Sequence, residues 1–372
     1  MKEGWDYKKL GDVAFYPTKR ISSEMVNENN YVGVDNLIKD RGGKVVANFF
    51  PTEGNVIEYL KGDVLLGNIR PYLKKIWLSD TKGGASGDVL IIRANDTKHL
   101  YPNYLYWALA SDQFFEYDNL HCKGAKMPRG NKIDIMQYLL PIPTIEEQQQ
   151  IVSELDLLSG VIEKQKAQLE ELDKLAQSIF YDMFGDPVTN EKGWENKKVG
   201  EIATFYNGKA HEKVIDDNGD YILVNAKFIA SKGEVIKRTN HQLFPLYKND
   251  IVMVMSDVPH GKALASCYLI EKDNQYSLNQ RICAFRKYKA NPVFLFNVLN
   301  RNSYYLRFDD GNGQTNMRKN EVTNCPIPLP PLSLQQEFAA KIEAIEAMKA
   351  KVRQSLKEAE TLFNERMDYY FN

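Results

Sequence analysis

The sequence predicts an α+β fold in which two similar mixed α/β globular domains are separated and followed by two long α-helices. The helices are expected to pack as an antiparallel coiled coil, giving the chain pseudo-two-fold symmetry. Three observations predict this: the two halves of the 372-residue chain repeat one another, each half contains short β-branched runs, and each half ends in a segment with coiled-coil spacing. The predicted segments are 1–144 (first domain), 145–185 (first helix), 186–331 (second domain) and 332–372 (second helix).

The internal repeat is clearest where "PIPTIEEQQQIVSELDLL" at 141–158 aligns without a gap with "PLPPLSLQQEFAAKIEAI" at 328–345. Upstream, "WDYKKLGDVAFYP" resembles "WENKKVGEIATFY", and "KGDVLLGNIRP" resembles "KNDIVMVMSDVP". A period of about half the chain is too long for a solenoid. Two similar halves instead indicate a molecule that offers the same surface twice, as a symmetric dimer would.

Within the globular segments, the runs "GDVLLGNI", "GDVLIIRA" and "RICAFRK" are rich in β-branched residues and bounded by turn formers, which predicts strands. The aromatic segments that follow Tyr101 and Asn291 are predicted to be helices. Asn103 is the candidate N-cap of the first of them.

The long segments show apolar residues at alternating spacings of four and three, which is the seam of a coiled coil. Each seam has one polar break, at Gln165 in the first segment and at Lys349 in the second. The alternative is two independent amphipathic helices on separate cores, but a seam of more than four heptads is seldom found in an ordinary domain helix. The predicted seam residues are Ile151, Leu155, Leu158, Ile162, Leu169, Leu172, Ile179, Phe338, Ile342, Ile345, Val352, Leu356 and Phe363.

The composition is that of an ordinary globular protein, with a net charge of −1 and 43% hydrophobic residues. Nucleic-acid binding would therefore have to come from local patches rather than from the overall charge. The start "MKEGWDYKKL" lacks the apolar core of a signal peptide, and no apolar run is long enough to cross a bilayer. Four scattered cysteines argue against a disulfide framework or a zinc site, so we expect a cytoplasmic protein.

No catalytic motif stands out. "NPVF" at Asn291 lacks the second proline of an amino-methyltransferase motif, and it falls where the repeat predicts a helix start. "HGKA" at His260 lacks the first glycine and the hydroxyl of a phosphate-binding loop. The five histidines have no paired metal-ligand spacing, so we expect neither a catalytic residue nor a metal ligand in this chain.

The order and duplication of these segments resemble the specificity subunit of type I restriction-modification systems. The stretches that carry the resemblance are "KGDVLLGNIRPYLKK", "PIPTIEEQQQIVSELD" with its partner "PLPPLSLQQEFAAKIE", and the helix ends "SIFYDMFGD" and "ERMDYYFN". Together they span essentially the whole chain. The second half departs from the first where "NIRPYLKK" becomes "SDVPHGKA", which limits any transfer of residue roles between halves.

The resemblance implies that the globular domains are target recognition domains that read a bipartite, interrupted sequence in double-stranded DNA. It also implies two adenine methyltransferase subunits docked on this chain, and motor-nuclease subunits that join for cleavage. S-adenosylmethionine, ATP and Mg²⁺ would then belong to those partners, and this chain would carry no cofactor and no catalytic activity of its own. The repeated helix starts around "EEQQQ" and "LQQE" could dock the methyltransferases, or simply cap their helices.

Three loops in each half carry the side chains that contact phosphates and base edges in DNA complexes. The first loops are 16–23 and 206–213, the second loops are 68–75 and 256–262, and the third loops are 121–132 and 311–320. Their candidate DNA-binding residues are Lys19, Arg20, Asn68, Arg70, Tyr72, Lys74, Lys75, Lys123, Lys126, Arg129, Lys132, Lys209, His211, Lys213, Ser256, His260, Lys262, Gln314, Asn316, Arg318 and Lys319.

Each of these residues has a plainer interpretation as a solvated surface charge, and Arg70 could instead be a structural arginine paired with Asp63 or Asp88. Two other functions stay open at this level. One is a coiled-coil scaffold whose globular ends bind proteins, which predicts no steep salt dependence of binding to DNA. The other is a stand-alone methyltransferase or nuclease, against which the missing motifs count.

Overall fold

The computed structural model describes residues 4–124 and 126–372, which form two compact units. Unit 1 comprises Met1–Lys166 together with Arg353–Asn372, and unit 2 comprises Ala167–Val352. Each unit therefore contains one globular domain and one half of each long helix, so the units cut across the predicted helix segments. The prediction of an α+β fold with two similar domains is confirmed.

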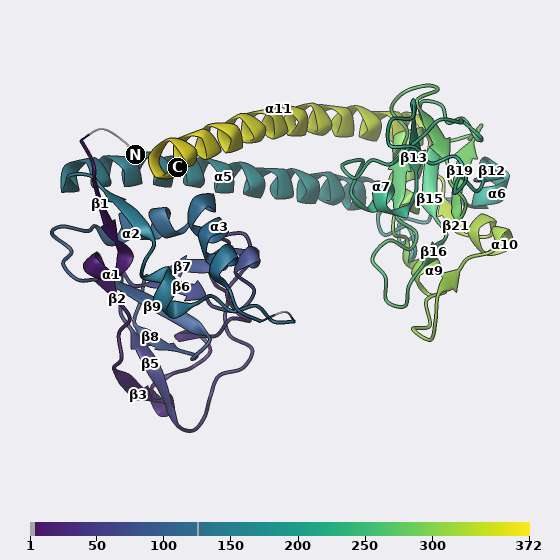
Figure 1. Cartoon of the computed structure of the whole chain (residues 1–372). Coiled ribbons are helices and arrows are strands. Elements are labelled where there is room, and N and C mark those ends of the chain that lie inside the picture. The colour runs from purple at the N-terminus through teal and green to yellow at the C-terminus, as the bar shows by residue number, and fades with distance from the viewer. Residues whose placement is uncertain (1–3, 125) are drawn as a thin grey trace. The chain divides into compact units, whose positions relative to one another are not determined.

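The elements of the first half are shown in Figure 1. They are β1 (Asp6–Lys9), α1 (Leu10–Val13), β2 (Ala14–Phe15), β3 (Arg20–Ser22), η1 (Ser23–Met25), β4 (Tyr31–Val32), β5 (Asn55–Tyr59), β6 (Val64–Gly67), η2 (Pro71–Leu73), β7 (Ile76–Leu78), β8 (Gly83–Ala85), β9 (Val89–Ala94), α2 (Pro102–Leu109), α3 (Asp112–His121), α4 (Lys132–Ile135), β10 (Leu139–Ile142) and α5 (Ile145–Phe184).

The elements of the second half follow the same plan. They are β11 (Asn196–Lys198), α6 (Val199–Ile202), β12 (Thr204–Asn207), β13 (Tyr221–Val224), α7 (Ala226–Ala230), β14 (Arg238–Thr239), β15 (Ile251–Val254), β16 (Ser256–Asp257), β17 (Cys267–Leu269), β18 (Tyr276–Leu278), β19 (Ile282–Arg286), α8 (Pro292–Leu299), α9 (Ser303–Leu306), β20 (Thr315–Asn316), α10 (Lys319–Thr323), β21 (Pro326–Pro328) and α11 (Leu332–Phe371).

A four-stranded antiparallel sheet forms the centre of each domain, with strand order β2-β9-β6-β7 in unit 1 and β12-β19-β15-β17 in unit 2. Its strands include the three β-branched runs singled out in the sequence. A second sheet follows, β3-β5-β8-β4 in unit 1 and β14-β13-β18 in unit 2. In each unit the strand at the start of the domain pairs with the Pro-rich strand before the long helix, β1 with β10 and β11 with β21.

A buried aspartate fixes the central sheet of each unit, directly before β6 in unit 1 and directly before β15 in unit 2. Asp63 accepts hydrogen bonds from the Arg93 guanidinium at 2.7 and 2.8 Å and from the Leu60 backbone N–H at 2.7 Å. Asp250 is bonded in the corresponding way. It accepts hydrogen bonds from the Arg286 guanidinium and from the Tyr247 backbone N–H, both at 2.8 Å. The two units therefore repeat a charge-assisted contact as well as a sequence pattern.

The helices α2 and α8 cover the central sheets, and both begin with proline as their first residue. Asn291 caps α8, because its side chain accepts hydrogen bonds from Val293 and Phe294. The prediction that Asn103 caps α2 is wrong, because the N-cap is Tyr101 and Asn103 lies inside the helix. Proline has no N–H and a helical φ, so the helix starts at Pro102, one residue before Asn103.

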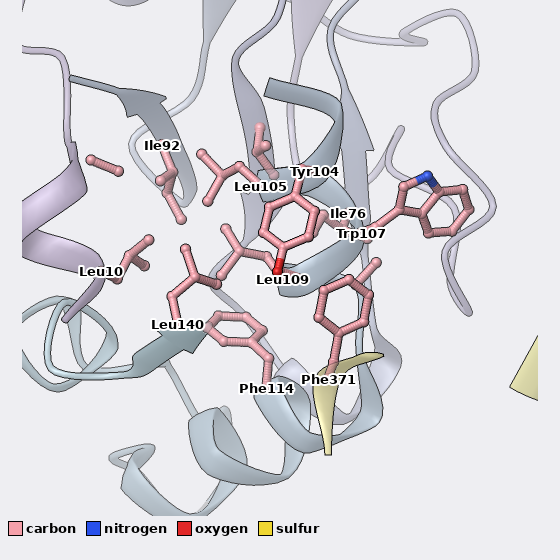
Figure 2. Packing of buried hydrophobic residues seen from close by; sticks show 14 of the residues in the cluster. Leu10, Ile76, Ile92, Tyr104, Leu105, Trp107, Leu109, Phe114, Leu140 and Phe371 are labelled. Atoms are coloured by element: carbon pink, nitrogen blue, oxygen red, sulfur yellow. The ribbon is translucent and has the colours of Figure 1, made fainter. Parts of the chain in front are cut away.

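The core of unit 1 joins the sheet, α2, α3 and the ends of both long helices. Figure 2 shows Phe371, from the end of α11, among Tyr104, Leu109 and Phe114. The Tyr104 and Phe371 ring centroids lie 5.6 Å apart. In unit 2 the corresponding cluster contains Phe184, at the end of α5, and residues of α8. In each unit, an aromatic side chain at the end of a long helix thus packs into the core of the globular domain.

Within each unit, the halves of α5 and α11 lie side by side and antiparallel (Figure 1). Every predicted seam residue is buried or half-buried. Polar contacts fill the two breaks of the seam. Gln165 donates to Ser355 at 2.6 Å in unit 1, and the buried Lys349 contacts Asp173 and Glu346, each at 2.6 Å, in unit 2.

Candidate nucleic-acid interface

In unit 1 the second and third candidate loops are joined by backbone hydrogen bonds. The N–H of Gly130 donates to the carbonyl of Asn68 at 3.1 Å, and the N–H of Arg70 donates to the carbonyl of Pro128 at 2.8 Å. Ile69 and Arg129 form an isolated antiparallel bridge between these bonds. Two segments about 60 residues apart in the sequence thus form one surface.

Unit 2 joins its second and third loops in the same way. There the contact is a regular strand pair, in which β16 lies antiparallel to β20, with Ser256 opposite Asn316. The N–H of Met317 donates to the carbonyl of Met255 at 2.8 Å, as Gly130 does to Asn68 in unit 1. These bonds place Met255 at the position of Asn68. The alignment of Asn68 with Ser256 made from the sequence is therefore wrong by one residue.

Arg70 is exposed and lies at the turn between β6 and η2 with φ at +54°. The structural pairing considered for Arg70 does not occur, because Asp63 is bonded to Arg93 and Asp88 faces Arg129 at 3.4 Å. Within the part of the chain that the structure describes, no acidic side chain pairs with the Arg70 guanidinium. A left-handed arginine before a proline is strained, and such strain is typical of functional loops.

The other cations of the second loop of unit 1 are less available. Lys74 donates to Asp112 at 2.6 Å, and Lys75 donates to the carbonyl of Val34 at 2.6 Å. Tyr72 is 54% exposed. Lys74 and Lys75 therefore hold the loop to neighbouring segments, while Arg70 and Tyr72 face solvent.

The second loop of unit 2 is shaped by Asp257, which the sequence analysis did not select. Its carboxylate accepts hydrogen bonds from the backbone N–H of Ala263 at 2.7 Å and of Leu264 at 3.0 Å. His260 and Lys262 are exposed at the tip of this loop, whereas Ser256 is buried. The Ser256 hydroxyl contacts Asn316 and Gln314 at 2.7 and 3.0 Å and so ties the two loops together.

The third loops present all of their predicted DNA-binding side chains to solvent. Their exposed candidates are Lys123, Lys126, Arg129, Lys132, Gln314, Asn316, Arg318 and Lys319. Arg318 lies at the start of α10, where its backbone N–H donates to Glu321 at 2.6 Å and leaves the guanidinium outside the cap. The joined second and third loops thus carry most of the predicted cations of each unit.

The first loops are held elsewhere in each unit. Lys19 pairs with Glu58 at 2.8 Å, and Arg20 lies in β3 opposite Ile57. In unit 2, Lys209 and Lys213 are exposed, but His211 is 1% exposed and its ring nitrogens contact the Lys209 carbonyl and the Ser277 hydroxyl. His211 therefore has a packing role, because both of its ring nitrogens already have partners and neither is available to contact DNA.

A cavity of about 740 Å³ opens beside the joined loops of unit 1. Its lining combines Arg70 and Lys75 with the aromatic residues Phe49 and Phe50. Phe49 is 89% exposed. Cationic and aromatic side chains around one hollow are suited to phosphates and to unstacked bases.

Two aspartates beneath the joined loops were missed by the sequence analysis. Asp118 in unit 1 is buried, neither of its carboxyl oxygens has a hydrogen-bond partner among the described residues, and burial raises its pKa to about 6. Asp309 in unit 2 accepts hydrogen bonds from the backbone of His260 and Gly311. Asp118 follows the helix N-cap Ser111 by the same number of residues as Asp309 follows the helix N-cap Asn302. This correspondence could have been found in the sequence repeat.

Among the described residues, no group of three or more His, Cys, Asp or Glu side chains could hold a metal ion. All four cysteines are free, and burial raises the pKa of the Cys267, Cys283 and Cys325 thiols. Over the same residues, no helix is long and apolar enough to cross a membrane.

Comparison with known proteins identifies the family. The family described as "Type I restriction modification DNA specificity domain" matches residues 2–174 and 191–360. The chain is 22% identical to the type I restriction enzyme MjaVIII specificity subunit of Methanocaldococcus jannaschii, over 92% of this chain and 86% of that protein. It is 25% identical to the EcoDI specificity subunit of Escherichia coli, over 52% of this chain and 44% of that protein.

Two solved structures share the fold. The specificity subunit from M. genitalium matches with a TM-score of 0.60 at 13% identity, covering 99% of this chain and 96% of that one. A chain from a study of assembly and conformational transition of the type I restriction-modification system matches with a TM-score of 0.57 at 20% identity, covering 100% and 98%. With two copies of the family domain in tandem, the chain belongs to the type I restriction-modification specificity subunits, the non-catalytic DNA-recognition components of those multi-subunit complexes.

Proposed function

We propose that the joined second and third loops of each unit bind one half of a bipartite, interrupted target in double-stranded DNA. The observation that carries this proposal is the repetition of the same loop pairing in both units, made by bonds between backbone groups. Loops that are fixed to a rigid sheet are the usual carriers of binding residues. Different side chains on the same pairing then give each unit its own half-site.

The roles within the loops follow from side-chain chemistry. Arg70, which has no acidic partner among the described residues, offers a planar fork that suits two acceptors on a guanine edge or a phosphate. In unit 2, Arg318, Asn316 and Gln314 supply the donors and acceptors for base edges. The exposed lysines of the third loops add phosphate contacts, which predict a steep dependence of binding on salt.

We further propose that two adenine methyltransferase subunits dock on this chain and that motor-nuclease subunits join them for cleavage. S-adenosylmethionine, ATP and Mg²⁺ would be bound by those partners, and the complex would act in the cytoplasm. The repeated start of the long helices supports two equivalent docking places. A hollow of about 540 Å³ at the start of α5, lined by Glu147, Gln150 and Tyr369 among others, suits such a partner.

The test is a map of adenine methylation. The chain is expressed with the methyltransferase encoded beside it, in a host that lacks this methylation, and the genome is sequenced for modified adenines. We expect one interrupted motif that disappears when this chain is omitted. A complex without new methylation would favour a scaffold, and methylation by this chain alone would reveal an active site of its own.

A further inference from the structure

The Asp118 carboxyl group is buried beneath the joined loops of unit 1 without a hydrogen-bond partner among the described residues. The residue is 1% exposed, and both of its carboxyl oxygens are buried and unbonded. A buried carboxylate without a donor is strongly unfavourable, so such a group either takes up a proton or acquires a partner.

A second acceptor, the side-chain oxygen of Asn68, lies near the same glycine, Gly130, as the Asp118 carboxyl group. Asn68 is 6% exposed, and its buried Oδ1 has no hydrogen-bond partner in the described part of the chain. A Cβ built on Gly130 would lie 2.5 Å from Asp118 Oδ1 and 2.9 Å from Asn68 Oδ1, so both oxygens border the same small space over Gly130. Two acceptors across one space need a proton between them, and a neutral carboxyl group supplies one.

Within residues 4–124 and 126–372, no cationic side chain is hydrogen-bonded to Asp118. Burial is the larger influence on the Asp118 pKa and raises it, while His121 on the same helix opposes the shift. Tyr16 donates to the carbonyl of Lys132, and Tyr117 donates to the carbonyl of Asp134. The titratable and charged groups on the surrounding segments are Tyr16, Asp88, Tyr117, His121, Arg129, Lys132 and Asp134.

The repeat provides a natural comparison in unit 2. Asp309 is half-buried, and its carboxylate accepts hydrogen bonds from the backbone N–H of His260 at 2.9 Å and of Gly311 at 3.1 Å. The Thr315 hydroxyl donates to it at 3.4 Å. These donors come from the second and third loops, so Asp309 bridges them. Met255 occupies the position of Asn68, so no side-chain amide stands at that position in unit 2.

We propose that the two aspartates fasten the loops of their units in opposite protonation states, Asp118 as a neutral carboxyl group that donates to Asn68 and Asp309 as a carboxylate that accepts from His260 and Gly311. Both are positioning residues, and their importance for DNA rests on the proposed function of the loops. As pH rises and Asp118 loses its proton, the contact with Asn68 is lost. The loops of unit 1 then loosen, whereas those of unit 2 do not.

The matched substitutions are Asp118→Asn and Asp309→Asn. An asparagine at 118 always carries N–H donors for Asn68, so this variant should keep the loops closed and remove their response to pH. An asparagine at 309 turns an amide N–H₂ toward backbone donors. It should therefore raise hydrogen exchange in peptides covering 311–320 by about tenfold or more. Exchange is measured on the full chain and corrected for the intrinsic effect of pH.

A titration of the unmodified chain tests the same point without relying on a variant's stability. With aspartate labelled by ¹³C at the carboxyl carbon, the Asp118 signal is assigned by its loss in Asp118→Asn. We expect the neutral form to persist to about pH 6, well above the ordinary range of an aspartate. A signal that titrates at the ordinary value would show that Asn68 turns its Nδ2 toward a carboxylate, and would overturn the proposal.

Equal responses of the two Asp→Asn variants would overturn it as well. Neither readout involves DNA, so the outcome is separate from that of the proposed function. If the loops behave as expected and no methylation motif depends on this chain, only the proposed function fails.

Discussion

Gln148 accepts a hydrogen bond at 2.8 Å from the backbone N–H of Tyr101, which lies 47 residues earlier in the chain. The Gln148 side chain also donates to the carbonyl of Pro143 at 2.9 Å. In unit 2, Gln335 makes the corresponding bonds to Asn291 at 2.8 Å and to Pro330 at 2.7 Å. Both glutamines are fully buried, so each one fixes the start of a long helix to the start of the helix that covers the sheet.

We expect Gln148→Ala to lower the free energy of unfolding of the full chain by about 1–3 kcal/mol, because it leaves a partly buried N–H and a buried carbonyl unbonded. Gln335→Ala should cost a similar amount in unit 2. Urea denaturation of the full chain measures both. The neighbouring Gln149 is exposed, so Gln149→Ala is the control and should change stability by about 0.5 kcal/mol or less. Equal effects of all three changes would mean that the buried bonds contribute nothing.

The buried Asp63–Arg93 pair gives a second prediction. Asp63→Ala leaves the guanidinium of Arg93 without its carboxylate in a largely buried place, so we expect a loss of about 3–5 kcal/mol. Asp250→Ala should act in the same way on unit 2 through Arg286. The exposed Lys61 beside Asp63 is the control position. A thermal melt of each variant measures this loss of stability. An unchanged melting midpoint for Asp63→Ala would contradict the stabilising role of the Asp63–Arg93 pair.

The third prediction concerns pH and Asp118. Burial raises the pKa of this carboxyl group from the usual 3.8 to about 6, so the folded chain holds its proton more tightly than the unfolded chain. The stabilisation is therefore complete below the ordinary pKa and is lost as pH rises through about 6. Relative to Asp118→Asn, the unmodified chain should lose about 3 kcal/mol of stability between about pH 4 and pH 7.

The difference in unfolding free energy between the two proteins, measured across this range, isolates Asp118 from other titrating groups. A difference that stays constant with pH would show that Asp118 has an ordinary pKa in the folded chain.

The buried Lys349 in α11 gives a fourth prediction. Its ammonium group lies 2.6 Å from both Asp173 and Glu346, and its side chain is 6% exposed. Lys349→Ala removes both ion pairs, but the partner carboxylates are about half exposed, so we expect a cost of about 2 kcal/mol. Lys351→Ala, at an exposed position on the same helix, is the control. If both variants unfold at the same denaturant concentration, the polar break is not a stabilising contact.

Much of the fold could be predicted because its signals are local. The β-branched runs form β6, β9 and β19, and the apolar spacing gives the long helices α5 and α11. The repeated prolines and glutamines mark the same junction in both halves. The start of α2 was misplaced because both Pro102 and Asn103 are residue types that mark helix starts. In the structure Pro102 is the first helical residue.

The candidate site could be predicted only in part, because its assembly depends on contacts between distant segments. The cations of the second and third loops were selected, but their pairing depends on backbone bonds such as that from Gly130 to Asn68. His211 resembles a surface residue in a Lys-rich loop, yet tertiary packing buries it against Ser277. Asp118 and Asp309 were missed because an acid near a helix end is common, and only burial distinguishes them.

The most direct test of the account is the methylation map of two single variants, Arg70→Ala in unit 1 and Arg318→Ala in unit 2. Each is co-expressed with the methyltransferase, and Lys351→Ala serves as the control. A lost base contact should cost about 1–3 kcal/mol of discrimination at one position. We expect Arg70→Ala to relax one half of the interrupted motif and Arg318→Ala to relax only the other half. Variants that change both halves alike, or neither, would contradict the assignment of one half-site to each unit.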